Sequence, residues 1–413
     1  MPRHISLAAA LLMGLLLVAC SKSPEPASAP QVESAAEQAQ RIANSSIIVD
    51  THIDLPMRLA ENDSDITLEQ SRYDFDYPKA VAGGLNVPFM SIYTAAELEA
   101  TGKSKEKAEQ LIEVVESIEN RWPDKFRIAR TTADVREQFA AGLMSLPMGM
   151  ENGSPIEGDL DNIEYFYGRG IRYITLAHSL SNHLSDSSYD DERKWNGLSP
   201  LGKQAVAEMN RVGIMIDVSH LSDEAFWQVM ELSGAPTIAS HSSARHFTPG
   251  SERNMNDEMI KALAENGGVI QINFGSYFLT DDARQYGSAR SAAGKIYQAQ
   301  NPELTESYMY TEYPAIYAAE QGPFPYATLD DVLDHFDHVV SLAGIDHVGI
   351  GSDYEGVGDS LPAGLKNVSE YPNLIEGLLR RGYSEDDVQK ILGENLLRVW
   401  QQVEQYAADA TSG

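Results

Sequence analysis

A histidine and an aspartate stand two residues apart, as His52 and Asp54, at the end of an apolar run that begins at Ile47. Such a β-branched run is typical of a buried parallel strand. Because side chains alternate between the faces of a strand, His52 and Asp54 lie on the same face. An imidazole beside a carboxylate suits a divalent metal ion, and a hydrogen-bonded turn is the structural alternative.

Side chains that can bind metals or carry protons also end other apolar runs. With the first pair, the set comprises His52, Asp54, Glu151, His178, His220, His241 and Asp353. Three histidines and two carboxylates can hold two divalent ions, with one carboxylate bridging them. The fourth run ends in His178 and not in a lysine that could bridge two ions, so Glu151 is the candidate for the bridge. Gly149 and Gly153 beside it predict a turn that leaves room for metal ions. Asp353 is interpreted as the general acid and base.

The elements that must position these residues are eight apolar, β-rich runs with amphipathic stretches between them. The runs cover residues 47–54, 84–93, 143–151, 171–178, 212–220, 236–241, 268–274 and 347–353. This alternation predicts parallel strands joined by helices, and eight repeats favour a closed (β/α)8 TIM barrel over an open sheet. The carboxyl ends of barrel strands converge on one face, so the strand-end residues are predicted to share one site.

The barrel is predicted to form one domain over residues 41–408, with an insertion at about 275–328 between the seventh and eighth strands. A long segment after a strand belongs on the active-site face. We therefore predict a helical lid there, with a structural elaboration or a subunit contact as the alternatives. Residues 384–406 are predicted to form a final helix.

Residues 1–19 have the layout of a secretory signal peptide, with Arg3 and His4 before an apolar stretch. The segment 17–20, which ends in Cys20, resembles a bacterial lipobox. This resemblance implies cleavage before Cys20 and acylation of that residue, and an ordinary signal peptide with an incidental cysteine is the alternative. Cys20 is the one cysteine of the chain, so no disulfide can form within it.

Residues 20–40 are rich in Ser, Pro, Ala, Glu and Gln and are predicted to form a flexible, lipidated tether. By resemblance to lipoprotein sorting rules, Ser21 after the cysteine implies delivery to the outer membrane. The expected location is therefore the cell envelope, with a lipid anchor in the outer membrane facing the periplasm. The formal net charge of −30 argues against nucleic acid and anionic lipid surfaces as partners.

The motifs together resemble those of the membrane (renal-type) dipeptidases, a family of zinc peptidases, over nearly all of residues 44–400. The matching stretches are V-D-T-H-I-D, G-M-E-N-G, I-T-L-A-H-S, I-D-V-S-H, A-S-H-S-S-A-R, R-N-M-N-D and H-V-G-I-G-S-D-Y-E-G. The resemblance implies a binuclear zinc enzyme that hydrolyses dipeptides (L-Xaa-L/D-Xaa) by attack of a metal-bridging hydroxide. It also implies a homodimer.

Roles carry over from this family residue by residue. The resemblance implies that His52 and Asp54 bind one Zn²⁺, that Glu151 bridges both ions, and that His220 and His241 bind the second. It further implies that His178 binds substrate and stabilises the tetrahedral intermediate, that Arg253 grips the terminal carboxylate of the substrate, and that Asp353 moves the proton. The insertion at 275–328 differs from the family pattern, which leaves substrate preference open.

Two other functions remain possible from the sequence. One is lactone, phosphoester or deaminase chemistry on the same binuclear site, because a fold and its metals do not define a reaction. The other is a tethered solute-binding or scaffold lipoprotein without catalysis. The complete ligand set and Asp353 argue against the second, and Glu151 with Arg253 argues against the first.

Overall fold

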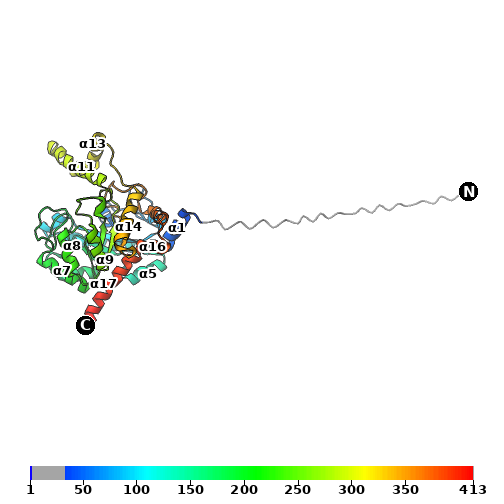
Figure 1. Ribbon diagram of the computed structural model, residues 1–413, viewed down its shortest axis with the longest axis horizontal. Coiled ribbons are helices and arrows are strands. Elements are labelled where there is room, and N and C mark those ends of the chain that lie inside the picture. Colours follow the sequence, from blue (N-terminus) through cyan, green and yellow to red (C-terminus); the bar gives the residue numbers. More distant parts are fainter. Residues whose placement is uncertain (2–32, 413) are drawn as a thin grey trace. The chain divides into compact units, whose positions relative to one another are not determined.

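Eight parallel strands close into a barrel in the computed structural model, which describes Met1 and residues 33–412 (Figure 1). Around the barrel the order is β1, β10, β9, β8, β7, β6, β5 and β2. Their bounds are β1 (Ile48–Ile53), β2 (Leu85–Tyr93), β5 (Met148–Glu151), β6 (Ile171–Thr175), β7 (Met215–Asp217), β8 (Ile238–Ser242), β9 (Val269–Ile272) and β10 (Val348–Ile350). The predicted (β/α)8 barrel is confirmed.

The predicted third strand, 143–151, is divided in two. Its first part is β4 (Met144–Ser145), which pairs with β3 (Phe126–Arg127) in a separate two-stranded sheet. Only β5 enters the barrel. Pro147 stands between the two parts, and a proline has no N–H to donate to a strand ladder. The prediction of one continuous strand was therefore wrong.

Helices surround the barrel, and several of them begin at polar caps. Side chains of Ser199, Ser222, Asn256 and Thr328 accept hydrogen bonds from backbone N–H groups in the first turns of α7, α8, α9 and α14. The surrounding helices are α2 (Leu55–Glu61), α3 (Tyr77–Gly83), α4 (Ser104–Arg121), α5 (Thr132–Ala140), α6 (Asp161–Arg169), α7 (Pro200–Val212), α8 (Asp223–Leu232), α9 (Asp257–Glu265), α14 (Leu329–Ala343) and α15 (Tyr371–Arg380).

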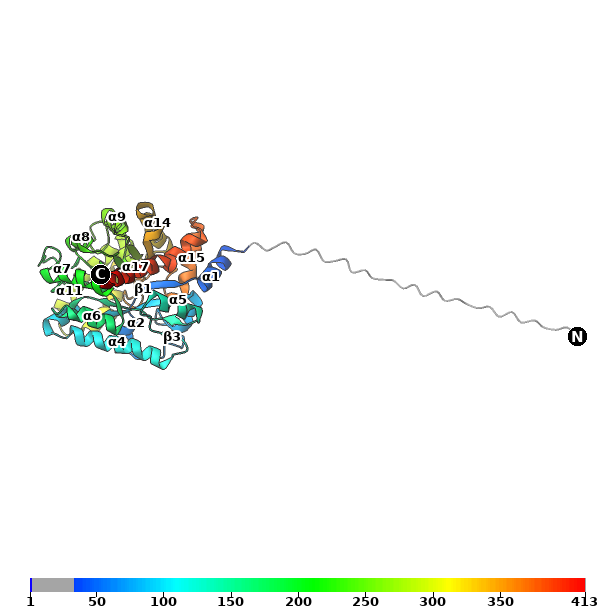
Figure 2. The same ribbon diagram turned by 90° about the horizontal axis from the view of Figure 1, so that it is seen from below.

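The predicted last helix, 384–406, is interrupted. It consists of α16 (Glu385–Gln389), a π-helical turn (Lys390–Glu394) and α17 (Asn395–Ser412). Gly393 lies so close to β1 that a Cβ there would stand 2.6 Å from the carbonyl oxygen of Ile47. This close approach lets α17 pack against the amino-terminal end of the barrel, where Trp400 is fully buried beside Phe89. Figure 2 shows α17 next to β1.

The folded part begins earlier than the expected residue 41, because α1 spans Ala35–Ser45. Ala39, Ile42 and Ala43 of this helix are fully buried, so the last residues of the expected tether belong to the core. The predicted signal peptide and Cys20 lie outside the described residues. Within the described part of the chain, no helix has the length and apolar character needed to span a membrane.

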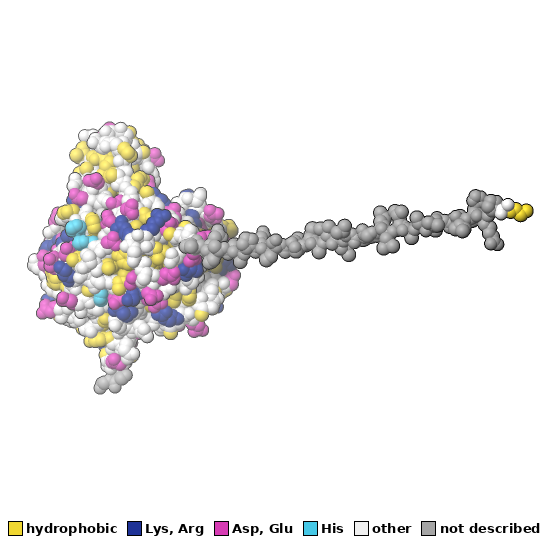
Figure 3. Space-filling model, turned by 45° about the vertical axis from the view of Figure 1, so that its right-hand side comes forward, with side chains coloured by type: hydrophobic (Ala, Val, Ile, Leu, Met, Phe, Trp, Pro, Cys, Tyr) yellow, Lys and Arg dark blue, Asp and Glu magenta, His cyan; other side chains and the backbone are white. Residues whose placement is uncertain are grey.

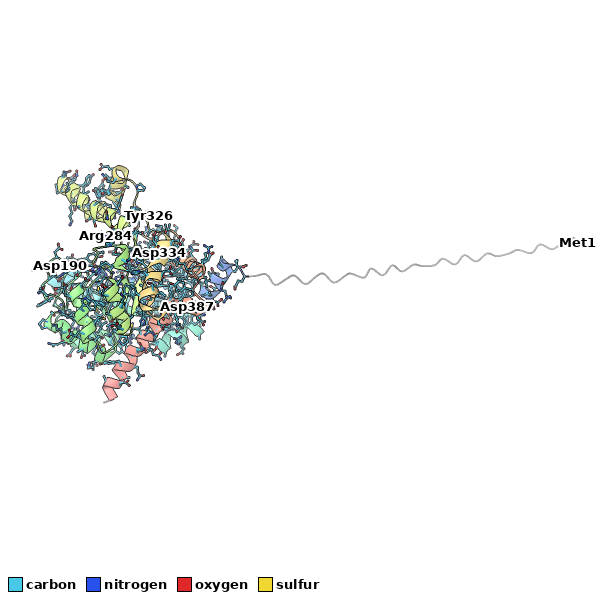
Figure 4. All side chains as sticks on the ribbon, viewed as in Figure 1. Met1, Asp190, Arg284, Tyr326, Asp334 and Asp387 are labelled. Carbon is cyan, nitrogen blue, oxygen red and sulfur yellow. The ribbon has the colours of Figure 1, made fainter. Side chains whose placement is uncertain are left out.

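The segment between β9 and α14 is helical, as expected. It contains α10 (Ser276–Leu279), α11 (Asp281–Gln300), α12 (Glu306–Thr311) and α13 (Tyr313–Gln321). Figure 1 shows α11 and α13 projecting from the barrel, and Figure 4 labels Arg284 and Tyr326 near the base of this projection. The insertion therefore stands over one end of the barrel.

Candidate active site

Glu151, the last residue of β5, lies at the centre of the converging strand ends. Its Oε1 is 3.2 Å from Nε2 of His220 and 3.2 Å from Nε2 of His241. Its Oε2 is 3.4 Å from Nε2 of His52, and His178 approaches Oε1 to 3.4 Å. One carboxylate thus faces four imidazoles, which is the arrangement that a bridging ligand requires.

His52 is oriented by a tyrosine of β6. The hydroxyl of Tyr173 donates to the carbonyl of Thr51 at 3.0 Å and lies 2.9 Å from Nδ1 of His52. Because the single hydroxyl proton goes to Thr51, the oxygen accepts from Nδ1–H of His52, and the lone pair is assigned to Nε2. Nε2 of His52 is buried and makes no hydrogen bond within the described part of the chain. It faces Oε2 of Glu151 at 3.4 Å and Oδ2 of Asp54 at 3.6 Å, where a cation would be held between the three groups.

His241 is oriented in the same way from β7 and β8. The hydroxyl of Ser240 donates to Oδ2 of Asp217 at 2.6 Å and lies 2.7 Å from Nδ1 of His241. Oδ1 of Asp217 accepts from the backbone N–H of Ser240 at 2.8 Å. The serine oxygen therefore accepts from Nδ1–H of His241, and Nε2 presents its lone pair toward Glu151.

Burial keeps two of the histidines neutral. Burial, and then the charge of Arg253, lowers the pKa of His220 well below its usual value. Burial, and then the neighbouring His52, does the same to the pKa of His241. Neutral imidazoles are the form that binds metal ions. His220 also has a left-handed backbone with φ of 68°, which a side chain adopts at a cost and which is common at functional sites.

The carboxylates of Glu151 and Asp54 favour a positive charge on His52, which faces both of them. Burial opposes a charge on His52, but Tyr173, Glu151 and Asp54 outweigh it and raise the pKa of His52 well above its usual value. Burial alone would raise the pKa of Glu151, yet His52 and His178 hold it well below its usual value. The site therefore favours a cation between these groups.

Asp353 follows β10 and faces the same centre. Oδ2 of Asp353 accepts a hydrogen bond from Nδ2 of Asn273 at 2.8 Å. The backbone of Asp353 has a φ of 65°. Burial, and then the nearby Asp54 and Glu151, raises the pKa of Asp353 to about 7. A carboxyl group with such a pKa can both accept and return a proton near neutral pH.

Arg253 lies on the loop between β8 and α9 and reaches the histidines. Its Nη1 donates to Ser242 at 2.7 Å, and its Nη2 donates to the carbonyl of His241 at 2.6 Å. Nη2 is also 3.0 Å from Nε2 of His220. The ring of Phe278, at the base of the insertion, lies 5.2 Å from the guanidinium. These contacts hold the guanidinium of Arg253 beside the histidines, in the wall of the cleft.

The donor atoms of the site form three overlapping groups that fit a metal ion. They are His52, Glu151 and His241; Glu151, His178 and His220; and His52, Asp54 and Asp353. Every group shares a member with another, which suits two adjacent ions better than one. All predicted site residues within the described chain are brought together, and His178 lies among possible ligands as well as near the expected substrate position.

The role predicted for Gly149 was wrong. A Cβ at this position would stand 1.9 Å from Cζ of Tyr173, so the glycine makes room for the tyrosine ring. Glu355, two residues after Asp353, also lines the cleft, and its Oε1 accepts from the N–H of Phe75 at 2.8 Å and lies 3.4 Å from Nε of Arg58.

Several supporting residues were missed from the sequence, namely Tyr173, Asp217, Ser240 and Asn273. Asp217 and Ser240 lie within the quoted motifs, three residues before His220 and one residue before His241, and that position was an available signal. Tyr173 gave none, because a tyrosine inside a β-rich run is an ordinary core residue.

The site opens into a cleft of about 1570 Å³, bordered by the insertion. Its floor carries Glu151, His178 and Asp353, and aromatic residues of the insertion line the outer part. Among them, Tyr277 and Phe324 pack with ring centroids 5.1 Å apart. The cleft is far larger than the metal-capable centre, so the insertion shapes the space around a bound ligand.

The family model for membrane dipeptidase (peptidase family M19) matches residues 36–412. The dipeptidase tcpJ of Claviceps purpurea is 33% identical over 299 residues, which cover 72% of this chain and 60% of that protein. The chain thus spans less than two thirds of the length of this relative.

Two solved structures are also similar. One is the probable dipeptidase PvdM from Pseudomonas aeruginosa, with a TM-score of 0.79, 27% identity, and coverage of 90% of this chain and 99% of that one. The other is a metallopeptidase from Rhodobacter sphaeroides, bound to a phosphinate mimic of the dipeptide L-Ala-D-Ala. It has a TM-score of 0.71, 27% identity, and coverage of 87% and 100%.

Proposed function

Because the chain belongs to the membrane dipeptidase family, peptidase family M19, we propose that it hydrolyses dipeptides (L-Xaa-L/D-Xaa) with two Zn²⁺ ions bridged by Glu151. The observation that carries the proposal is the position of Glu151, whose two oxygens face His52 on one side and His220 and His241 on the other. The dipeptide mimic bound to the Rhodobacter sphaeroides metallopeptidase supports the substrate class.

The ligands divide around the bridge. His52 and Asp54 would hold one ion, and His220 and His241 the other. When bound, the two ions would acidify a water molecule and polarise the carbonyl of the scissile bond. The hydrogen bonds between Tyr173 and His52 and between Ser240 and His241 fix the orientations of the two imidazole rings that this binding needs.

The remaining residues act on the substrate. Oδ2 of Asp353 is occupied by Asn273, so its other oxygen accepts the proton of the attacking water and returns it to the leaving amine. His178 donates a hydrogen bond to the developing oxyanion. Arg253 binds the terminal carboxylate, and this requirement limits the substrate to short peptides.

The test is hydrolysis of L,L and L,D dipeptides before and after chelation, with metal content measured in parallel. We expect activity to disappear on chelation and to return with zinc at about two ions per chain, the number that three overlapping ligand groups suit. Full activity in the metal-free protein would refute the proposal. Two bound ions without cleavage of any dipeptide would instead favour lactone, phosphoester or deaminase chemistry, which a parallel panel of those substrates detects.

We also propose that Cys20 carries a lipid that anchors the enzyme to the outer membrane, facing the periplasm. Its support is the lipobox-like segment 17–20 and the Ser-, Pro- and Ala-rich stretch after it. Mass spectrometry of the amino-terminal peptide should detect acylated Cys20, and Cys20→Ser should release the enzyme from membranes. An unmodified Cys20 in the membrane fraction would refute this. Homodimer formation, expected from the family resemblance, is testable by light scattering.

A further inference from the structure

A second group of metal-capable side chains lies outside the cleft. His246 belongs to the 3-10 turn Arg245–Phe247, Asp257 begins α9, and His338 lies on α14. Each offers one donor atom, and these atoms all lie within 4.8 Å of one another. None of the three residues lines the cleft that holds Glu151. The group is therefore separate from the active site.

The three side chains already contact one another. Nε2 of His338 lies 2.8 Å from Oδ1 of Asp257. The rings of His246 and His338 are stacked, with centroids 4.4 Å apart and an interplanar angle of 23°. His246 is exposed, whereas the side chains of Asp257 and His338 retain 36% and 15% of their exposure. A hydrated ion can thus reach the group, and the exposed His246 ring can turn a nitrogen toward it.

An aromatic layer supports the group from below. The ring of Phe247 lies 4.9 Å from that of His246, 5.6 Å from that of His338 and 4.5 Å from that of His335. His335 is fully buried and bonded on both nitrogens, to the N–H of Ala244 and the carbonyl of Leu279, each at 3.0 Å. His246 and His338 therefore pack against the ring of Phe247, which the buried His335 supports, and this reduces the loss of conformational freedom on binding an ion.

We propose that His246, Asp257 and His338 bind a divalent transition-metal ion, best matched by Zn²⁺, at a site distinct from the active centre. Two imidazoles and one carboxylate are a ligand set that zinc prefers, with water completing the tetrahedron. The net charge of −30 adds a general attraction for cations. Figure 3 shows histidine side chains exposed at the surface of the folded part, some of them side by side.

An ion bound by these three residues would link the loop that carries Arg253 to α14. This loop runs from β8 to α9, and a bridge between Ala244 and Met255 closes it upon itself. His246 lies inside the loop and Asp257 directly follows it, whereas His338 belongs to the neighbouring α14. An ion held by all three would tie the two segments together and stabilise the fold.

The experiment compares zinc binding by the full chain and by His246→Ala, in buffers that hold free Zn²⁺ at fixed levels. His246 is exposed, so its replacement should leave folding intact. We expect the unmodified chain to bind one zinc ion per chain more than His246→Ala. Zinc beyond the amount that saturates the active site should raise the melting temperature of the unmodified chain and leave that of His246→Ala unchanged.

The matched control is His183→Ala, because His183 also faces a carboxylate, with Nδ1 3.4 Å from Oε1 of Glu99, but belongs to none of the ligand groups found in the described residues. It should bind as much zinc as the unmodified chain. Equal zinc in the unmodified chain and in His246→Ala would overturn the proposal. This readout is independent of hydrolysis, so failure of the dipeptidase assay leaves the zinc comparison decisive.

Discussion

The hydroxyl oxygen of Tyr173 lies 2.9 Å from Nδ1 of His52 and fixes which nitrogen of that histidine faces Glu151. Ser240 performs the same task for His241 at 2.7 Å, with Asp217 behind it. Tyr173 lies on β6, and Asp217 and Ser240 lie on the next two strands around the barrel, β7 and β8. Both contacts leave Nε2 of the ligand directed toward the same carboxylate. The barrel thus positions the predicted ligands and also sets the tautomers of His52 and His241.

Replacing Tyr173 with phenylalanine should weaken metal binding and activity. The change removes the oxygen that accepts from Nδ1–H of His52 and keeps the ring in place. Loss of such a supporting partner typically costs about 10- to 100-fold in metal affinity or activity. Competition with a chelator measures the affinity, and kcat/KM for a dipeptide measures the activity.

The control for this substitution is Tyr383→Phe. The hydroxyl of Tyr383 donates to Asp337 at 2.7 Å, and the residue does not line the cleft. It should leave metal affinity unchanged. If Tyr173→Phe also bound metal as tightly as the unmodified enzyme, the tyrosine would serve only the packing of the core.

Gly149→Ala should disturb the contact between Tyr173 and His52 by pushing against the ring of Tyr173. Its Cβ would stand 1.9 Å from the ring of Tyr173, which is fully buried and cannot move away freely. Overpacking of this kind costs about 1–3 kcal/mol in the free energy of unfolding. Urea unfolding measures the loss, and chelator competition should show weaker metal binding.

Gly168→Ala is the matched control, because no atom lies within 4 Å of a Cβ built at Gly168 in α6. It should raise stability by about 0.5–1 kcal/mol, as alanine is the better helix former. A Gly149→Ala enzyme as stable as the unmodified one would show that the ring of Tyr173 has space to shift.

That the candidate ligands would lie together could be predicted from the sequence, whereas the residues that support them could not. His52 and Asp54 follow from a spacing of two in a strand, and a barrel brings strand ends together whatever the details of packing. Tyr173 acts across the barrel on His52, and no local pattern encodes such a contact. Gly149 shows the same limit: the glycine was visible, but the ring that fills its space lies on another strand.

The boundaries of elements depended on similar long-range contacts. The break at Gly393 arises where the chain approaches Ile47, and α1 is stabilised by the burial of Ile42 in the core. Neither contact partner is near in sequence. Composition alone therefore assigned residues 35–40 to the tether and joined α16 to α17.

His335 should make the stability of the fold depend on pH. Burial lowers its pKa from 6.5 to about 4 in the folded protein. Between these two values the unfolded state binds more protons than the folded state. The free energy of unfolding should therefore fall as pH drops from 6.5 toward about 4, with this residue contributing up to roughly 3 kcal/mol.

Urea unfolding of the chelated enzyme across this pH range measures the effect, because chelation removes the separate pH dependence of metal binding. His335→Gln, which can still accept from Ala244 and donate to Leu279, should unfold with a shallower dependence on pH. An identical dependence in both proteins would mean that His335 does not carry the effect.

Arg253→Ala should raise the KM for dipeptides by about 10- to 100-fold, because a charge-assisted hydrogen bond contributes roughly 1.5–3 kcal/mol. Arg253→Lys keeps the charge but loses the planar pair of donors, so it should recover only part of the affinity.

Arg290→Ala is the control: Arg290 also lines the cleft, but its Nη2 donates to Tyr277 at 2.6 Å in the insertion. It should leave the KM of an Ala-Ala dipeptide unchanged. Steady-state kinetics on the zinc-loaded enzymes give these values. An unchanged KM in Arg253→Ala would remove the carboxylate clamp from the proposed mechanism, and Arg253 would then act only through its contacts to Ser242 and His241.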